Sequence, residues 1–109
     1  MDILTPQDFL IDWENLPEER SAGLTGFATI RTQQTDNLKI RLLTYSEGYE
    51  ADHWCTKGHI ITVQEGSLFI DFKDGSSMTV DKGKVSVLSE NNDPHKARTV
   101  EKAVVLIID

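Results

Sequence analysis

The sequence predicts an all-β fold, a barrel or sandwich of many short antiparallel strands. From Gly26 onward, short segments of alternating apolar and polar residues are separated by turn-forming pairs such as Glu65-Gly66 and Asp74-Gly75. The Asp74-Gly75 pair marks the clearest hairpin, for which we expect a type I′ turn with positive φ at both residues. At 109 residues the chain has room for one compact domain.

Nine strands are expected after this point of the chain. They are Phe27–Thr32, Leu38–Ser46, Ala51–Cys55, His59–Gln64, Ser67–Lys73, Ser76–Asp81, Lys84–Ser89, His95–Thr99 and Ala103–Ile108. In the fifth strand, side chains alternate between faces, so Leu68, Ile70 and Phe72 are expected to face the core.

The first 25 residues have a different texture, which favours a short N-terminal helix or arm. Thr5 is suited to cap a helix, Pro6 to its first position and Asp8 to its positively polarised first turn. Pro17 follows soon and would keep such a helix short. We therefore expect residues 1–25 to pack, as a helix or arm, on a barrel formed by residues 26–109.

Composition excludes several classes of function. Hydrophobic residues make up 39% and charged residues 27% of the chain, which is typical of a soluble globular protein. The net charge is −7 and no basic stretch stands out, so we expect no nucleic-acid partner. No apolar run approaches the ~20 residues of a membrane span, and no secretory signal is visible. The single cysteine fits a reducing cytoplasm, the expected location.

All the histidines and the one cysteine of the chain can be brought together. His53, Cys55 and His59 lie within seven positions. On a strand, residues 53 and 55 point to the same face, and a corner at Lys57-Gly58 would return His59 to that side. His95 begins a later strand, which barrel closure could place opposite the first three.

Two imidazoles and a thiolate from one hairpin, with a third imidazole from a later strand, suit a transition metal. Zinc is the expected ion, and Fe(II), Ni(II) or copper would also fit, whereas Mg(II) and Ca(II) prefer oxygen ligands. If His53, Cys55, His59 and His95 all bind, the site is closed and structural. If Cys55 stands off, a position opens for water or substrate.

Each of these residues also has a simpler interpretation. A single histidine is more often a surface or hydrogen-bonded residue, and a single cysteine a buried small apolar one. Cys55 as a nucleophile is less favoured, because no triad or oxyanion-hole pattern accompanies it. Arg41, Tyr45 and Glu47 are separated by even numbers of residues, so on a strand their side chains point to the same face. They could line a pocket mouth, face solvent or face a second subunit.

The segment from Gly48 to Gly66 resembles the first motif of the cupin family, in which a glycine precedes His-x-His, a glutamate and a further glycine. In that pattern, His53 stands at the first histidine, Cys55 at the second and His59 at the glutamate. Gly66 stands at the closing glycine.

A second cupin motif, a glycine followed by a strand that ends in Pro-His, resembles the stretch from Gly83 to Pro94-His95. The exchanges at Cys55 and His59 are similar to those of small bacterial cupins named for an Asp-His-Cys-Trp motif, here Asp52-His53-Trp54-Cys55.

The resemblance implies a cupin barrel, that is, a double-stranded β-helix or jelly roll, with a small-molecule pocket inside it. It also implies a homodimer. The expected role is a non-catalytic module that binds a metal or small ligand. The alternative is a metal-dependent enzyme of dioxygenase, isomerase or lyase type.

Overall fold

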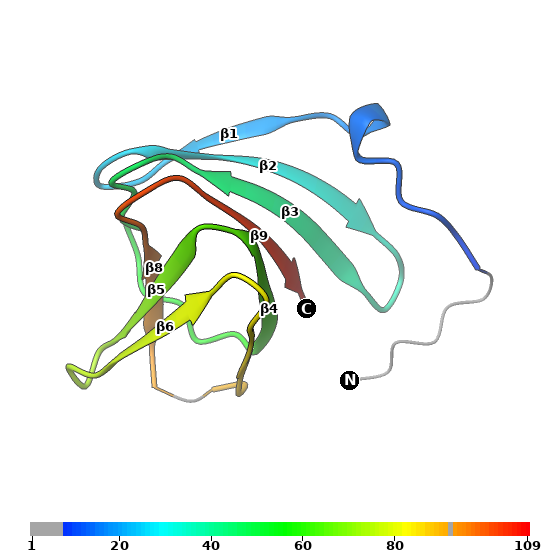
Figure 1. Cartoon of the computed structure of the whole chain (residues 1–109). Helices are drawn as coiled ribbons and strands as arrows, with labels where there is room; N and C mark the ends of the chain where they lie inside the picture. The colour runs from blue at the N-terminus through cyan, green and yellow to red at the C-terminus, as the bar shows by residue number, and fades with distance from the viewer. Residues whose placement is uncertain (1–7, 92) are drawn as a thin grey trace.

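The computed structural model describes residues 8–91 and 93–109, and almost all of its regular structure is β (Figure 1). The strands are β1 (Glu19–Ala22), β2 (Phe27–Gln34), β3 (Lys39–Tyr45), β4 (His59–Glu65), β5 (Ser67–Phe72), β6 (Ser77–Asp81), β7 (Val85–Leu88), β8 (His95–Arg98) and β9 (Ala103–Ile108). The predicted all-β fold class is therefore confirmed.

The strands form two antiparallel sheets. The larger has the order β1-β2-β3-β9-β4-β7 and the smaller the order β6-β5-β8. In Figure 1 the larger sheet curves from β1 round to β4, while β5, β6 and β8 close the opposite side. The last strand of the chain, β9, thus lies in the middle of the larger sheet, between β3 and β4.

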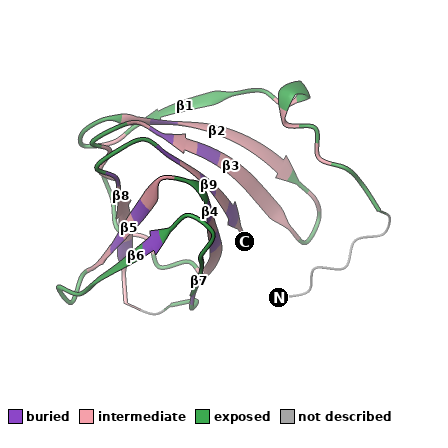
Figure 2. Ribbon diagram, in the orientation of Figure 1, coloured by how far each residue is buried: buried purple, intermediate pink, exposed green. Residues whose placement is uncertain are grey.

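The core lies between the sheets and follows the two-residue period of the strands. In β9, Ala103 and Val105 are fully buried, while Val104 between them is only half-buried. From the facing sheet, Leu68 and Ile70 are buried, as predicted, and Phe72 packs against the same core. Figure 2 shows these buried positions on the inner strands, whereas β1 is exposed along its length.

Eight of the nine expected strands are present, with ends shifted by at most a few residues. The prediction of a strand at Ala51–Cys55 was wrong: within this segment only Cys55 forms an isolated bridge, to His95. Strand β1 was not expected. It is an edge strand with no buried residue, so it carries no apolar alternation that the sequence could reveal.

The hairpin at Asp74-Gly75 is present and joins β5 to β6, but its turn type was wrong. Gly75 has a φ of 97°, whereas Asp74 does not have positive φ. Instead, the Asp74 carboxylate accepts a hydrogen bond of 2.8 Å from the backbone N–H of Ser76. The loop is thus longer than a two-residue turn and needs only one left-handed residue.

In the described part of the N-terminal arm, the stretch before β1 is fastened to β2 of the larger sheet. The helix start expected at Thr5–Asp8 lies outside the described residues except for Asp8, and the first helical residues described form a 3-10 turn, Trp13–Asn15. Arg31 of β2 holds this turn, donating hydrogen bonds to the carbonyl oxygens of Trp13 and Leu16 at 2.9 and 2.6 Å. No helix in the described part of the chain is long enough to span a bilayer.

Candidate metal centre

Two of the four predicted ligands are held side by side by backbone hydrogen bonds. The N–H of Cys55 donates to the carbonyl oxygen of His95 at 2.8 Å, and the N–H of His95 donates to that of Cys55 at 2.9 Å. Residues paired in this way point their side chains to the same face of a sheet. This single bridge therefore places the Cys55 thiol beside the His95 imidazole, although no regular strand includes Cys55.

His59 reaches the same place as the first residue of β4. The loop that joins it to Cys55 is held by hydrogen bonds to the segment that follows β7. The backbone N–H of Gly58 donates to the Glu90 carboxylate at 2.6 Å, and that of Asn91 donates to the carbonyl oxygen of Thr56 at 2.9 Å. These bonds fix the distance between Cys55 and His59 without a second strand.

The donor atoms of Cys55, His59 and His95 all lie within 4.8 Å of one another. The Cys55 Sγ and the His59 Nε2 are 3.5 Å apart. A tetrahedral zinc ion with ordinary Zn–S and Zn–N bonds would hold two such atoms about 3.6 Å apart. The three residues therefore fit one transition-metal ion in donor chemistry, and the Cys55–His59 pair also fits it in spacing.

Burial keeps two of these groups in the form that binds metals. The His59 side chain is 8% exposed and His95 is 7% exposed. Burial lowers the pKa of both imidazoles. The His59 ring, whose centroid is 5.4 Å from that of His95, lowers the pKa of His95 further. Neutral imidazole has a free lone pair for a metal, whereas imidazolium does not.

The second ring nitrogen of His59, Nδ1, lies beside a carboxylate. This Nδ1 lies 3.2 Å from the Asp109 Oδ2, which is also 3.4 Å from Nη2 of Arg41. Among the described residues, three buried atoms of this group make no hydrogen bond: the His59 Nδ1, the Arg41 Nε and the Asp109 Oδ1. A carboxylate behind the ring is the usual support of a metal-binding histidine.

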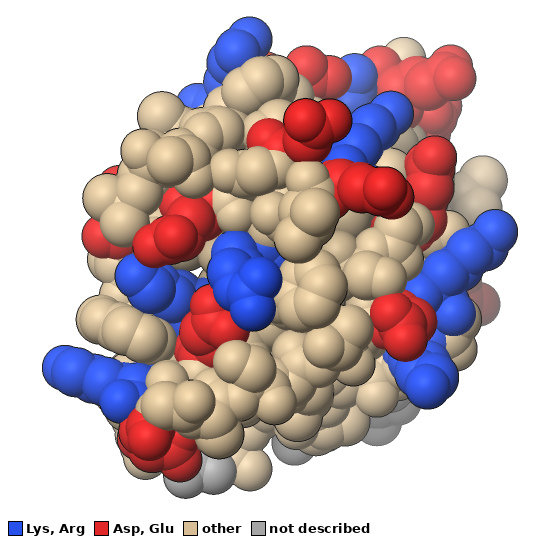
Figure 3. Space-filling model, turned by 60° about the vertical axis from the view of Figure 1, so that its left-hand side comes forward, with Lys and Arg blue, Asp and Glu red and all other residues tan. Residues whose placement is uncertain are grey.

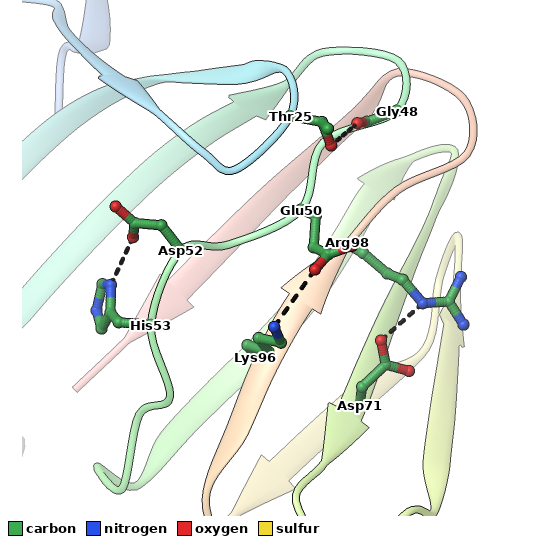
Figure 4. Close-up of polar contacts among 8 residues, drawn as sticks. All are labelled: Thr25, Gly48, Glu50, Asp52, His53, Asp71, Lys96 and Arg98. Atoms are coloured by element: carbon green, nitrogen blue, oxygen red, sulfur yellow. Dashed lines mark hydrogen bonds and ion pairs between the residues drawn. The ribbon is translucent and has the colours of Figure 1, made fainter.

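His53 lies apart from the other three predicted residues. Its side chain is 79% exposed, and its Nδ1 is 2.8 Å from the Asp52 carboxylate. Figure 4 shows this pair on one side of the segment before β4, while Glu50 points the other way, towards Lys96. The parity that placed His53 beside Cys55 requires a regular strand, and none forms here. Ligation by His53 stays a prediction.

The three donors line a cavity of about 310 Å³ between the sheets. Its rim is polar, with Lys39, Arg41 and Asp109 beside the donors, and its floor is apolar, with Ile61, Leu68 and Ile107 among its residues. The register explains this division. Lys39 and Asp109 exchange two backbone hydrogen bonds at the end of the sheet. Two residues further along β3, Arg41 pairs with Ile107 on the same face.

Of the three residues that shared one parity, Arg41 and Tyr45 line the cavity. Sequence reasoning missed Lys39 and Asp109. Both continue an inward alternation, Lys39 that of Arg41 and Asp109 that of Ile107, so period two could have identified them. The alternation of Arg41 and Tyr45 was not extended back to Lys39, nor that of the last strand forward to Asp109.

Comparison with known proteins found no matching family model and no matching curated protein sequence. Solved structures do match. A cupin-2 domain protein from Shewanella frigidimarina is 21% identical, with a TM-score of 0.60, over 73% of this chain and 78% of that one.

Two further structures match over more of the chain. A cupin-like protein from Thermotoga maritima is 21% identical, with a TM-score of 0.67, over 84% of this chain and 77% of its own. A sugar phosphate isomerase of the cupin superfamily from Silicibacter pomeroyi is 14% identical, with a TM-score of 0.69, over 91% and 73%.

The matches to solved structures and the strand order described above indicate the same fold. The sequence identities are low, so they speak for the fold and leave the Asp-His-Cys-Trp group of cupins a prediction. The chain therefore has the fold of a small cupin.

Proposed function

We propose that this protein binds one transition-metal ion through Cys55, His59 and His95 and presents it to a small molecule in the cavity. The observation that carries the proposal is the group of three donor atoms within 4.8 Å of one another at the rim of an internal cavity. Zinc is the ion that we propose, because mixed sulfur and nitrogen ligands in a tetrahedral arrangement are its common choice.

The number of ligands decides between a closed and an open site. With His53 as a fourth ligand the coordination sphere would be full, and the site would be structural. The exposed position of His53 and its contact with Asp52 favour three protein ligands instead. A fourth position then faces the cavity, where water or a small ligand can bind.

The role that we propose is a module that binds a small ligand at its metal. A metal-dependent enzyme is the second candidate, and one observation favours it: three protein ligands are also the usual number in catalytic zinc sites. A thiol ligand is kept reduced in the cytoplasm, which we propose as the location.

Cobalt(II) substitution tests the proposal. Cobalt takes the place of zinc and makes the site visible by absorption, with a thiolate-to-metal band in the near ultraviolet. We expect that band in the wild type and its loss in Cys55→Ser. Added imidazole, a neutral ligand, should shift the visible bands if a coordination position is open.

Each negative result has a definite meaning. A cobalt spectrum without the thiolate band would contradict ligation by Cys55. A spectrum with that band that does not respond to imidazole in the wild type, but does so in His53→Ala, would show a closed site with four protein ligands. Turnover of a substrate that stops on metal removal would establish the enzyme.

A further inference from the structure

The cavity carries an excess of positive charge that the metal centre does not explain. Four of its lining residues are basic: Lys39, Arg41, Lys57 and Lys96. Among the described residues that line it, Asp109 is the only carboxylate. The whole chain has the opposite balance, with 18 acidic and 11 basic residues.

Outside the cavity, some charges of opposite sign form ion pairs. Arg98 donates to the Asp71 carboxylate at 2.7 Å, a pair that Figure 4 draws. On the face shown in Figure 3, several basic side chains lie beside acidic ones. In the cavity, by contrast, the lining itself holds four basic residues and one carboxylate.

Two of the four cations in the cavity form ion pairs. Lys96 is 3.3 Å from the Glu50 carboxylate, and Arg41 is 3.4 Å from that of Asp109. The Nε of Arg41 is buried and makes no hydrogen bond among the described residues. The Oδ1 of Asp109 is also buried without a hydrogen bond, so the pair is joined through a single long contact and Arg41 keeps a free donor. A buried donor without a partner is costly, and a bound acceptor would remove that cost.

The other two cations, Lys39 and Lys57, form no ion pair within 4 Å in the described parts of the chain. Together with a divalent ion, they would give the cavity a strongly positive potential. A thiolate at Cys55 offsets only one of these charges.

We infer that the small molecule bound in the cavity is a carboxylate whose charged group pairs with Arg41 and whose hydrocarbon part enters the apolar floor. A guanidinium matches a carboxylate with two parallel hydrogen bonds. Ile61, Leu68 and Ile107 receive the apolar part. Asp109 beside Arg41 disfavours a doubly charged phosphate more than a singly charged carboxylate.

This inference rests on the proposed function, because the ligand would share the cavity with the metal. Calorimetric titration at low salt tests it, with linear carboxylates of two to eight carbons, their amides and inorganic phosphate as probes. We expect at least one carboxylate to bind ten times more tightly than its amide and than phosphate.

Matched variants assign the effect to the cavity. Arg41→Gln should weaken binding of that carboxylate at least tenfold and leave binding of the amide unchanged. Lys82→Gln makes the same change in net charge at an exposed residue outside the cavity and should have no effect. The zinc content of both variants is measured alongside, which identifies any loss of metal.

The outcomes separate the two proposals. If zinc binds but no carboxylate is preferred over its amide, or phosphate binds as tightly, the inference is overturned and the metal centre stands. If zinc does not bind but a carboxylate does, selectively and through Arg41, the metal proposal fails and the anion site stands.

Discussion

The Nδ1 of His59 lies 3.2 Å from the Oδ2 of Asp109, while its Nε2 faces the sulfur of Cys55. One ring thus connects a carboxylate to the donor group. The residues stand on neighbouring strands, each one position beyond the Ile60–Ile108 pair. The carboxylate can keep the proton on Nδ1 and so leave the lone pair of Nε2 free for a metal.

Asp109→Asn is expected to weaken zinc binding about 10- to 100-fold, because it removes the negative charge that supports His59. The affinity is measured by competition with a chelating indicator. Asp81→Asn is the matched control, since the Asp81 carboxylate is exposed, lies outside the cavity and accepts a hydrogen bond from Ser67. Equal affinities of Asp109→Asn and the wild type would show that the carboxylate does not act on the metal site.

Acid is expected to destabilise the metal-free protein from about pH 6.5 downward. Burial lowers the pKa of His59 and of His95, so the unfolded chain takes up protons in this range and the folded chain does not. The stability is therefore complete above the ordinary histidine pKa and falls as the pH falls.

Urea unfolding between pH 7.5 and 5.5 measures this effect. The variant His95→Gln should show a weaker dependence on pH than the wild type. Burial raises the pKa of Asp71, but hydrogen bonds from Arg98 and Ser77 and the nearby positive charges lower it on balance. Hydrogen bonds from Ser76 lower the pKa of Asp74. Both carboxylates therefore lose their contribution only at much lower pH. A free energy of unfolding that stays constant or rises as the pH is lowered from 7.5 to 5.5 would contradict the burial of neutral imidazoles.

Gly66→Ala is expected to destabilise the fold more than Gly75→Ala. Both glycines have positive φ, 76° and 97°, so alanine at either costs about 1–2 kcal/mol through backbone strain. At Gly66 an added Cβ would also collide with the carbonyl oxygen of Lys102 and crowd Ala103, whereas Gly75 has open space around it.

Urea unfolding of the two variants at pH 7.5 gives both values. A smaller loss of stability in Gly66→Ala than in Gly75→Ala would show that the chain at Gly66 moves freely away from β9. The motif glycine after β4 would then serve no packing role.

Much of the fold could be predicted from the sequence, because its strands are half-buried and alternate. β9 was predicted with its bounds, Ala103–Ile108, since every second residue is buried. β1 was missed because no residue of it is buried, so pairing with β2 alone defines it. The homodimer stays a prediction. Val85 and Val87 on the edge strand β7 are exposed apolar residues, of the kind that a second copy of the chain would cover.

The candidate site was predicted in part. His59 and His95 begin the strands that were expected, and Cys55 reaches them through a bridge to His95. The prediction for His53 depended on strand geometry between residues 51 and 55, which tertiary contacts of the loop override. Asp109 could not be chosen from the sequence as the partner of His59, because that contact depends on the register of β4 and β9.

The molar ratio of zinc to chain, measured by elemental analysis after loading and gel filtration, tests the central claim most directly. We expect a ratio close to one for the wild type and for His53→Ala, and a ratio far below one for Cys55→Ser, His59→Ala and His95→Ala, with folding checked by circular dichroism. A wild-type protein that retains no zinc, or a folded Cys55→Ser variant that keeps a full equivalent with unchanged affinity, would contradict the claim.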